Sequence, residues 1–215
     1  MKKIFYEEIE STNKTAKELN EAYSVIITHI QTGGYGKYDR PFYSPEGGLY
    51  MSITLPIDRT PSEFTMTAAV AVCRAIESVC KKSPKIKWVN DIILNNKKVG
   101  GILTESCGEN AIIGIGLNVF TKEFPPALPH AGAISDEDVR VSLSNEIIEH
   151  IENPQNIYDE YKSRIMLIGK QVRVSLANET FEATVLDLDI EARLIVKRND
   201  GACLHLVAGE VERIL

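Results

Sequence analysis

One segment, residues 87–105 with the sequence KWVNDIILNNKKVGGILTE, constrains the fold of this chain more than any other, because it predicts a β-hairpin. Apolar residues alternate on both sides of Asn95-Asn96, as expected for two antiparallel strands joined by a two-residue turn. Asparagine tolerates the left-handed backbone conformation that such a turn requires. We therefore interpret the segment as a hairpin within a β-sheet.

This interpretation decides which residues of the hairpin share a face. The expected register puts Ile93 opposite Lys98 and Asp91 opposite Gly100, and side chains alternate across each strand. One face is then predicted to carry Lys87, Asp91, Lys98 and Gly100. The other is predicted to be the core face, with Trp88, Asn90, Ile92, Val99 and Leu103. Charges of both signs beside a bare backbone are what a site for an anionic ligand needs.

Composition and charge argue against several classes of function. The chain has 215 residues, enough for one or two domains with a core, and its 44% hydrophobic and 25% charged residues are typical of a soluble protein. The net charge of −6 does not favour nucleic acid as a partner. No run of about 18 apolar residues is present to span a membrane. The N-terminal MKKIFYEEIE turns acidic too early for a signal peptide.

The cysteines and histidines do not form a metal or redox motif. Cys73, Cys80, Cys107 and Cys203 are spaced neither as paired zinc ligands nor as a CxxC site. The four histidines are scattered, so we expect no metal bound by protein side chains alone. Reduced, structural cysteines indicate a cytoplasmic protein.

Patterns along the rest of the chain indicate an α+β fold. Strands are predicted at 3–7, 25–30, 49–55 and 111–119, and helices at 11–23, 61–79 and, with a break near Pro154, 141–164. After Gly169 the pattern changes to short alternating strands separated by turn residues, which suggest a small β-barrel. We expect a mixed sheet flanked by helices in residues 1–167 and the barrel in residues 168–215.

The second informative segment, residues 31–52, predicts a loop that binds an anion. Its glycines at positions 33, 34 and 36 let the backbone approach a ligand closely, and their N–H groups can surround phosphate or carboxylate oxygens. Lys37 and Arg40 add positive charge. The loop is not a P-loop, because no Ser or Thr follows the lysine and no helix begins there. By itself, such a cluster also suits a flexible loop without a ligand.

Taken together, six short motifs resemble those of biotin protein ligases. They are STN at 11–13, QTxGxGK at 31–37, SPEGGLYMSI at 44–53, KWVND at 87–91, KKVGGIL at 97–103 and GIGLNV at 114–119. Their order and spacing agree with the family, which also ends in a small SH3-like barrel. The resemblance implies a catalytic domain of the class II aminoacyl-tRNA synthetase and biotin ligase type. It is to the short form of the family, without the N-terminal DNA-binding domain of the repressor-ligases.

The resemblance implies an ATP-dependent biotin--[acetyl-CoA-carboxylase] ligase. In this family the biotin carboxylate attacks the α-phosphate of ATP, giving biotinyl-5′-AMP and pyrophosphate. A lysine of a biotin carboxyl carrier protein then attacks the mixed anhydride, giving an amide and AMP. Bringing two anions together requires fixed cations and backbone donors. Mg²⁺ would accompany ATP and be held largely by the phosphates, because that ion usually takes few protein ligands.

Matching each motif position by position implies roles for residues of this sequence. The expected catalytic residues are Lys98, Lys37 and Arg40. The expected contacts to biotin are Ser11, Thr12, Asn13, Gln31, Gly34, Tyr35, Gly100 and Gly101. The expected contacts to ATP are Gly36, Lys37, Arg40, Phe42, Asn90, Asp91, Lys98 and Asn118. Ser11 and Thr12 also suit a helix cap.

Four positions depart from the family pattern, and one of them, Val89 in place of the usual proline of KWxND, is expected to be neutral. Tyr35 and Lys37 stand where the family commonly has two basic residues, and Phe42 stands where it usually has tryptophan. Lysine lacks the bidentate guanidinium that arginine offers to phosphate, so we expect a working site that retains biotinyl-AMP less tightly. Glycine-rich loops that close over an intermediate are often mobile, and mobility is expected for residues 33–43 without ligand.

Two other functions stay open. A lipoate or octanoate ligase or transferase shares the catalytic fold, although its glycine and arginine motifs differ from KWxND and KxxGIL. A non-catalytic sensor of biotin or adenylate is suggested by the missing arginine, although Lys98 is retained. The partners that we expect are biotin, ATP and a biotin carboxyl carrier protein domain, with neither DNA nor membrane. The family often pairs through a sheet edge, so a homodimer is also considered.

Overall fold

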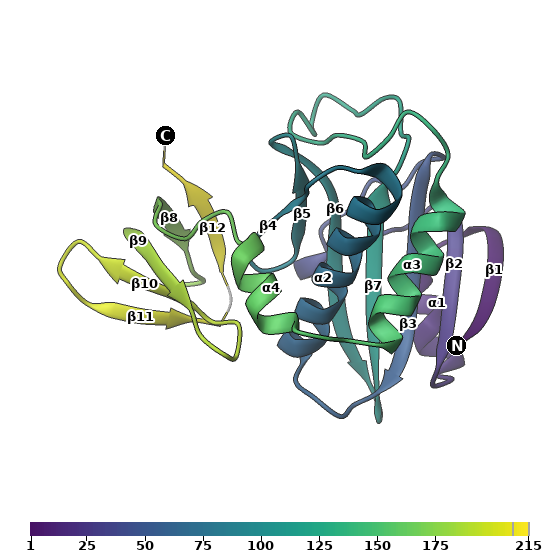
Figure 1. Cartoon of the computed structure of the whole chain (residues 1–215), viewed down its shortest axis with the longest axis horizontal. Coiled ribbons are helices and arrows are strands. Elements are labelled where there is room, and N and C mark those ends of the chain that lie inside the picture. The colour runs from purple at the N-terminus through teal and green to yellow at the C-terminus, as the bar shows by residue number, and fades with distance from the viewer. Residues whose placement is uncertain (208, 215) are drawn as a thin grey trace.

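The fold consists of two β-sheets, one of them flanked by helices (Figure 1). The structure is a computed structural model that describes residues 1–207 and 209–214. The larger sheet has seven strands in the order β1-β2-β3-β7-β6-β5-β4. β1 pairs with β2 in parallel and the other neighbours pair antiparallel, so the predicted mixed sheet is confirmed. Its strands are β1 (Lys2–Ile9), β2 (Ser24–Gln31), β3 (Gly48–Pro56), β4 (Lys85–Lys87), β5 (Asp91–Leu94), β6 (Lys97–Cys107) and β7 (Asn110–Asn118).

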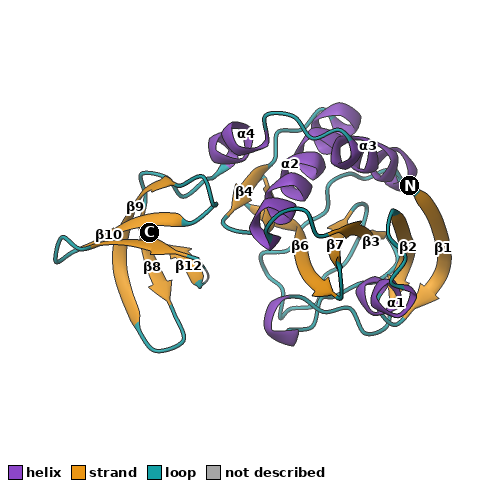
Figure 2. Cartoon of the chain, turned by 90° about the horizontal axis from the view of Figure 1, so that it is seen from below, coloured by secondary structure: helices purple, strands orange, loops and turns teal. Residues whose placement is uncertain are grey.

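Helices lie on both faces of the larger sheet: α2 and α3 cover one face, and α1 covers the other (Figure 2). The helices are α1 (Thr12–Leu19), α2 (Pro61–Cys80), α3 (Arg140–Glu152) and α4 (Ile157–Arg164), with a short 3₁₀ turn, η1 (Lys37–Asp39). α2 begins at a capping box. The Thr60 hydroxyl accepts a hydrogen bond from the Glu63 N–H, and the Glu63 carboxylate accepts one from the Thr60 N–H. This cap fixes the start of the long helix over the core.

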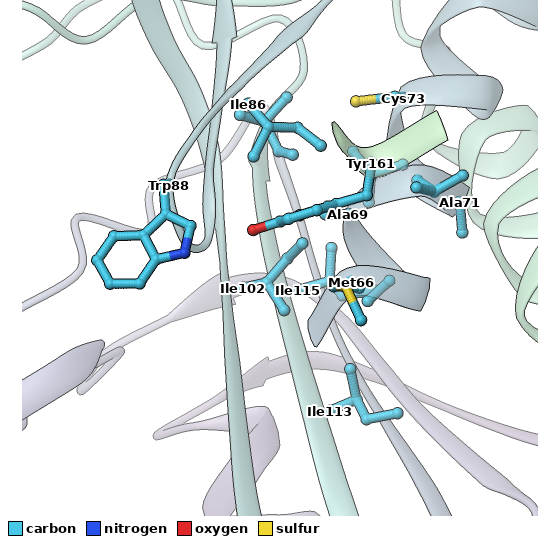
Figure 3. Packing of buried hydrophobic residues seen from close by; sticks show 14 of the residues in the cluster. Met66, Ala69, Ala71, Cys73, Ile86, Trp88, Ile102, Ile113, Ile115 and Tyr161 are labelled. Carbon is cyan, nitrogen blue, oxygen red and sulfur yellow. The ribbon is translucent and has the colours of Figure 1, made fainter. Parts of the chain in front are cut away.

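The main core lies between α2 and the larger sheet (Figure 3). Met66 of α2 packs there with Ile102 and Ile113 of the sheet, and all three are buried. Tyr161 of α4 is also fully buried, and its hydroxyl donates a hydrogen bond to the carbonyl of Val89 at 2.7 Å. α4 is therefore anchored to the segment between β4 and β5.

The predicted hairpin is present as β5 and β6. Asn95 and Asn96 form its two-residue turn, and both have positive φ, 50° and 59°, as a type I′ turn requires. Ile93 pairs with Lys98, which confirms that part of the predicted register. β4 adds a third antiparallel strand beside β5.

A β-bulge in β6 shifts the rest of the hairpin by one residue. Asp91 pairs with Gly101, so the predicted pairing with Gly100 is wrong. The bulge also exchanges two side chains between the faces. Ile102 is buried in the core, whereas Leu103, predicted there, is half-buried on the opposite side. Gly101 therefore lies beside Asp91 on the charged face of the hairpin, in the place predicted for Gly100.

α1 is shorter than predicted, because it ends at Leu19 instead of continuing to position 23. Asn20 takes a left-handed conformation with φ 43°, and its N–H donates to the carbonyl of Ala16. Such a residue stops a helix, and asparagine is one of the few side chains that tolerate it. Tyr23 also has positive φ, which is incompatible with helix.

The smaller sheet follows α4 and is antiparallel, in the order β11-β10-β9-β8-β12, which is consistent with the predicted SH3-like barrel. Its strands are β8 (Gln171–Ser175), β9 (Thr180–Leu188), β10 (Leu194–Arg198), β11 (Cys203–Leu206) and β12 (Glu210–Arg213). It contacts the rest of the chain through hydrogen bonds from Trp88 Nε1 to the Ala192 carbonyl and from the Tyr158 hydroxyl to the Leu188 carbonyl. Within the described residues, no helix is both long and apolar enough to cross a membrane.

Candidate active site

A cavity of about 370 Å³ lies on the α1 side of the larger sheet. Its walls come from the start of α1, the glycine loop (residues 33–43), the β5–β6 hairpin and β7. The predicted site residues that line it are Ser11, Thr12, Asn13, Gln31, Tyr35, Gly36, Lys37, Arg40, Phe42, Asn90, Asp91, Lys98 and Gly101. Gly34, Gly100 and Asn118 lie outside this lining. The fold thus brings most of the predicted residues together from segments far apart in sequence.

Hydrogen bonds join the polar residues at the start of α1 to β2. Ser11 caps α1 by accepting a hydrogen bond from the Lys14 N–H. Gln31 Oε1 accepts from both the backbone N–H and the hydroxyl of Thr12, at 2.8 and 3.1 Å. Gln31 Nε2 in turn donates to Ser44 Oγ at 3.0 Å. Three segments of the chain are therefore held in one arrangement at the cavity wall.

A half-buried carboxylate, that of Glu105 on β6, lies behind this wall. It accepts hydrogen bonds from Asn13 Nδ2 at 2.7 Å, Lys17 Nζ at 2.6 Å and the Tyr35 hydroxyl at 2.9 Å. Burial opposes ionisation of Glu105, but these hydrogen bonds outweigh it and lower the pKa below its ordinary value. Glu105 and Lys17 are not among the predicted site residues, because they lie outside the six motifs.

Lys98 and Asp91 form an ion pair across the hairpin, with 2.7 Å between Nζ and Oδ1. Lys37 of the glycine loop and Lys87 of β4 line the same cavity. Burial lowers the pKa of Lys37, the charge of Lys98 lowers it further, and Asp91 acts in the opposite direction. Asp91 thus pairs with Lys98 and acts on Lys37 through its charge alone, and the repulsion between the two lysines favours the binding of an anion near them.

The glycine loop folds back on itself. The N–H of Gly36 donates to the carbonyl of Arg40, and the N–H of Phe42 donates to the carbonyl of Gly34, both at 2.9 Å. A Cβ on Gly34 would lie 2.5 Å from Ser44 Oγ, so a larger residue would not fit. Gly34 therefore serves the packing of the loop against β2 and does not itself face the cavity.

Two glycines of β7 make room for the cavity wall. A Cβ on Gly114 would lie 2.3 Å from Asn13 Oδ1, and one on Gly116 would lie 2.6 Å from the ring of Phe42. Neither glycine is among the predicted site residues. A signal was present in the sequence, because the two glycines alternate along a predicted strand and so share one face.

A smaller hollow of about 120 Å³ shares Phe42 and Lys98 with the main cavity. Gly100 and Asn118, which lie outside the main cavity, line this hollow. Asn118 is buried, and its Nδ2 donates to the carbonyl of Gly132 at 3.2 Å. Except for Gly34, the predicted residues thus line two connected spaces that meet at Lys98.

The smaller sheet completes one rim of the main cavity. Gly209 and the first residues of β12, including Glu210 and Glu212, line it. The guanidinium of Arg40 forms an ion pair with Glu210. The alternating strands after Gly169 carry none of the six motifs, so this contribution could not be predicted from the sequence.

The cavity offers a cation few ligands. In residues 1–207 and 209–214, no three His, Cys, Asp or Glu side chains gather closely enough to bind a metal ion. The carboxylates along the wall belong to Asp91, Glu210 and Glu212, and the first two already pair with Lys98 and Arg40. A divalent cation here would therefore take most of its ligands from a bound substrate, as Mg²⁺ does with nucleotide phosphates.

Family models match both parts of the chain. Residues 5–118 match the biotin/lipoate A/B protein ligase family, and residues 167–213 match the biotin protein ligase C terminal domain. The bifunctional ligase/repressor BirA of Bacillus subtilis (strain 168) is 34% identical over 236 residues, covering 92% of this chain and 70% of the relative. The biotin--[acetyl-CoA-carboxylase] ligase of Mycobacterium tuberculosis is 26% identical, with 87% and 77% covered.

Solved structures share the fold over nearly the whole chain. The biotin protein ligase from Aquifex aeolicus in complex with biotin and ATP superimposes with a TM-score of 0.87 at 23% identity, covering 99% of each chain. The biotin protein ligase from Leishmania major in complex with biotinyl-5-AMP gives a TM-score of 0.70 at 25% identity, covering 96% of this chain and 99% of that one. The chain therefore belongs to the biotin protein ligase branch of the biotin/lipoate A/B protein ligase family.

Proposed function

We propose that this chain is an ATP-dependent biotin protein ligase, which activates biotin as biotinyl-5′-AMP and transfers it to a lysine of a biotin carboxyl carrier protein domain. One observation carries the proposal: Lys98, Lys37 and Asp91 meet in a cavity whose wall also holds the polar residues of the STN motif. The match of residues 167–213 to the biotin protein ligase C terminal domain favours biotin over lipoate as the substrate.

In the proposed first step, a carboxylate oxygen of biotin bonds to the α-phosphorus of ATP, and the bond from that phosphorus to the pyrophosphate oxygen breaks. Two anions must approach each other, so their repulsion has to be offset at the reacting centre. Lys98 of the hairpin and Lys37 of the glycine loop both line the cavity and supply positive charge there. Mg²⁺, when bound with ATP, would neutralise part of the phosphate charge.

In the proposed second step, the neutral amine of the acceptor lysine attacks the carbonyl carbon of the mixed anhydride. A C–N bond forms, the C–O bond to AMP breaks, and the amine loses a proton to solvent. The anhydride also reacts with water, so the cavity must cover it until the carrier arrives. The glycine loop, joined to β12 by the Arg40–Glu210 pair, is placed to provide that cover.

The two connected spaces suggest how the substrates divide. We assign biotin to the main cavity, where Ser11, Thr12 and Gln31 offer hydrogen-bond partners to a polar ring. Gly101, on the charged face, is better placed than Gly100 to let the ligand lie against β6. The adenine is assigned to the smaller hollow, which is lined by Phe42 and Asn118. The reacting phosphate then lies where the spaces meet, at Lys98.

Biotin-dependent exchange of labelled pyrophosphate into ATP tests this proposal. A biotin ligase exchanges label with biotin and then adds the mass of a biotinyl group to a carrier domain. Exchange with lipoate in place of biotin would select a lipoate ligase instead. Binding of biotin without any exchange would identify a non-catalytic sensor.

Further parts of the proposal concern organisation. We place the domain division at 167/168, because Met166 still hydrogen-bonds to β4 whereas Gly169 hydrogen-bonds to β9. A cytoplasmic location fits the four free cysteines. The acidic net charge of −6 gives no support for DNA as a partner. A homodimer could use β1, which lies at the edge of the larger sheet, and sedimentation velocity would detect it.

A further inference from the structure

Tyr35 has a side-chain contact that ligand binding alone does not explain. Its hydroxyl donates a hydrogen bond to Glu105 Oε2 at 2.9 Å and lies 3.3 Å from Lys17 Nζ, which can donate to it. The same ammonium group lies 5.8 Å from the centre of the Tyr35 ring. The glycine loop is therefore attached to β6 and α1 through one tyrosine.

Glu105, which accepts the hydrogen bond from Tyr35, is itself held by other residues. Glu105 Oε1 accepts from Lys17 at 2.6 Å and Oε2 accepts from Asn13 at 2.7 Å. Asn13 is buried, and its Oδ1 accepts a hydrogen bond from the buried hydroxyl of Ser52 on β3. The carboxylate that accepts from Tyr35 is thus held by two residues of α1, one of which is itself hydrogen-bonded to β3, so its orientation does not depend on the loop.

Hydrogen bonds within the loop link Tyr35 to the loop residues that line the cavity. Gly36 bonds to Arg40 and Phe42 bonds to Gly34, so the two limbs of the loop form one unit around Tyr35. Lys37 is two residues beyond Tyr35 and lines the main cavity together with Lys98, and Phe42 lines both spaces. Fixing Tyr35 therefore restricts the groups of the loop that surround the ligand.

Contrary to the mobility expected of this loop without ligand, we propose that Tyr35 is a positioning residue: its hydroxyl, held by Glu105 and Lys17, keeps the glycine loop folded over the cavity before any ligand binds. This inference rests on the proposed function for its kinetic consequence, and on the contacts alone for its structural one. A loop that is already folded costs less free energy to order when biotin arrives, so apparent affinity rises with the folded fraction.

Tyr35→Phe tests the proposal, because it removes only the hydroxyl. Hydrogen bonds to charged groups shift equilibria by about 10-fold or more. We therefore expect amides of residues 34–42 to exchange about 10-fold faster in the ligand-free variant than in the wild type. The KM for biotin in pyrophosphate exchange should rise by a similar factor, while kcat changes by less than about 3-fold.

A pair of lysines on one helix gives a matched control. Lys17→Met removes a partner of Glu105 and should change loop exchange and the KM for biotin in the same direction as Tyr35→Phe. Lys14, one turn earlier on α1, pairs instead with the exposed Glu10. Lys14→Met should leave both measurements at wild-type values.

Three results would overturn the proposal. Wild-type exchange in residues 34–42 of Tyr35→Phe would show that the hydroxyl does not hold the loop. Faster loop exchange with an unchanged KM for biotin would show that the contact does not position the site. Lower melting temperature and faster exchange across the whole chain, again with unchanged KM, would assign Tyr35 to stability alone. If the wild type supports no biotin-dependent exchange, the proposed function fails, and loop exchange alone still decides whether the attachment exists.

Discussion

Lys98→Met probes the proposed catalytic centre, because methionine keeps an unbranched side chain and removes the charge. If Lys98 stabilises charge that develops on the α-phosphate, its loss should lower the rate of adenylation by about 10²–10³-fold, the usual effect of removing one such stabiliser. Asp91 would then face the phosphates without its partner, which adds repulsion. The expected loss therefore lies at the upper end of that range.

The same substitution should barely change stability. The side chains of Lys98 and Asp91 are 42% and 23% exposed, so water screens much of their attraction. Pairs of this kind contribute about 0–1 kcal/mol to folding. For a chain of this size, that corresponds to a shift in melting temperature of no more than about 2–4 °C.

Pyrophosphate exchange measures the rate, calorimetry measures biotin affinity, and a thermal melt measures stability. Asp91→Asn is the matched variant, since it breaks the same ion pair but keeps Lys98, and it should lose much less activity. Exchange by Lys98→Met within about 5-fold of the wild type, with an intact fold, would refute a role for Lys98 in stabilising the reacting phosphate.

Other predictions follow from the same structure. Lys37→Arg introduces a bidentate guanidinium, so biotinyl-AMP should leave about 10-fold more slowly than from the wild type; equal off-rates would reject the idea. A Cβ on Gly100 would lie 2.4 Å from Leu117 Cδ2, whereas one on Gly101 would come no closer than 3.7 Å to its neighbours. Gly100→Ala should therefore lower the free energy of unfolding by about 1–3 kcal/mol in urea melts, and Gly101→Ala should lower it much less; the reverse order would contradict the bulge. Because hydrogen bonds lower the pKa of Glu105 despite its burial, its stabilising effect is present above the unfolded pKa and is lost as pH falls through the folded pKa. The difference in unfolding free energy between wild type and Glu105→Gln should thus shrink on acidification from about pH 7 to pH 3, and a constant difference would disprove the linkage.

The sequence predicted the elements of the fold well where local chemistry decides them. The Asn95-Asn96 turn and the Thr60 capping box follow from the backbone preferences of a few adjacent residues. The bulge in β6 was not predicted, because it depends on how the strand fits between β5 and β7. That one-residue shift moved Leu103 out of the core and replaced Gly100 by Gly101 on the charged face.

The residues of the candidate site that lie within the six motifs could largely be predicted from the sequence. The residues in and behind the cavity wall that left no signal in the sequence are those fixed by long-range packing. Glu105 meets Lys17 from 88 residues away, and Glu210 reaches Arg40 from the other sheet. Neither pair leaves a pattern in the sequence around it, because each contact depends on the arrangement of whole elements.

Trp88 has a practical consequence for this protein. It is the one tryptophan of the chain, and it is only 4% exposed. The residue borders the main cavity, and its indole N–H donates a hydrogen bond to the carbonyl of Ala192 near the smaller sheet. Indole emission moves to longer wavelength when the ring meets water. Intrinsic fluorescence of the unlabelled chain should therefore report both filling of the cavity and separation of the two sheets, with no dye or engineered reporter.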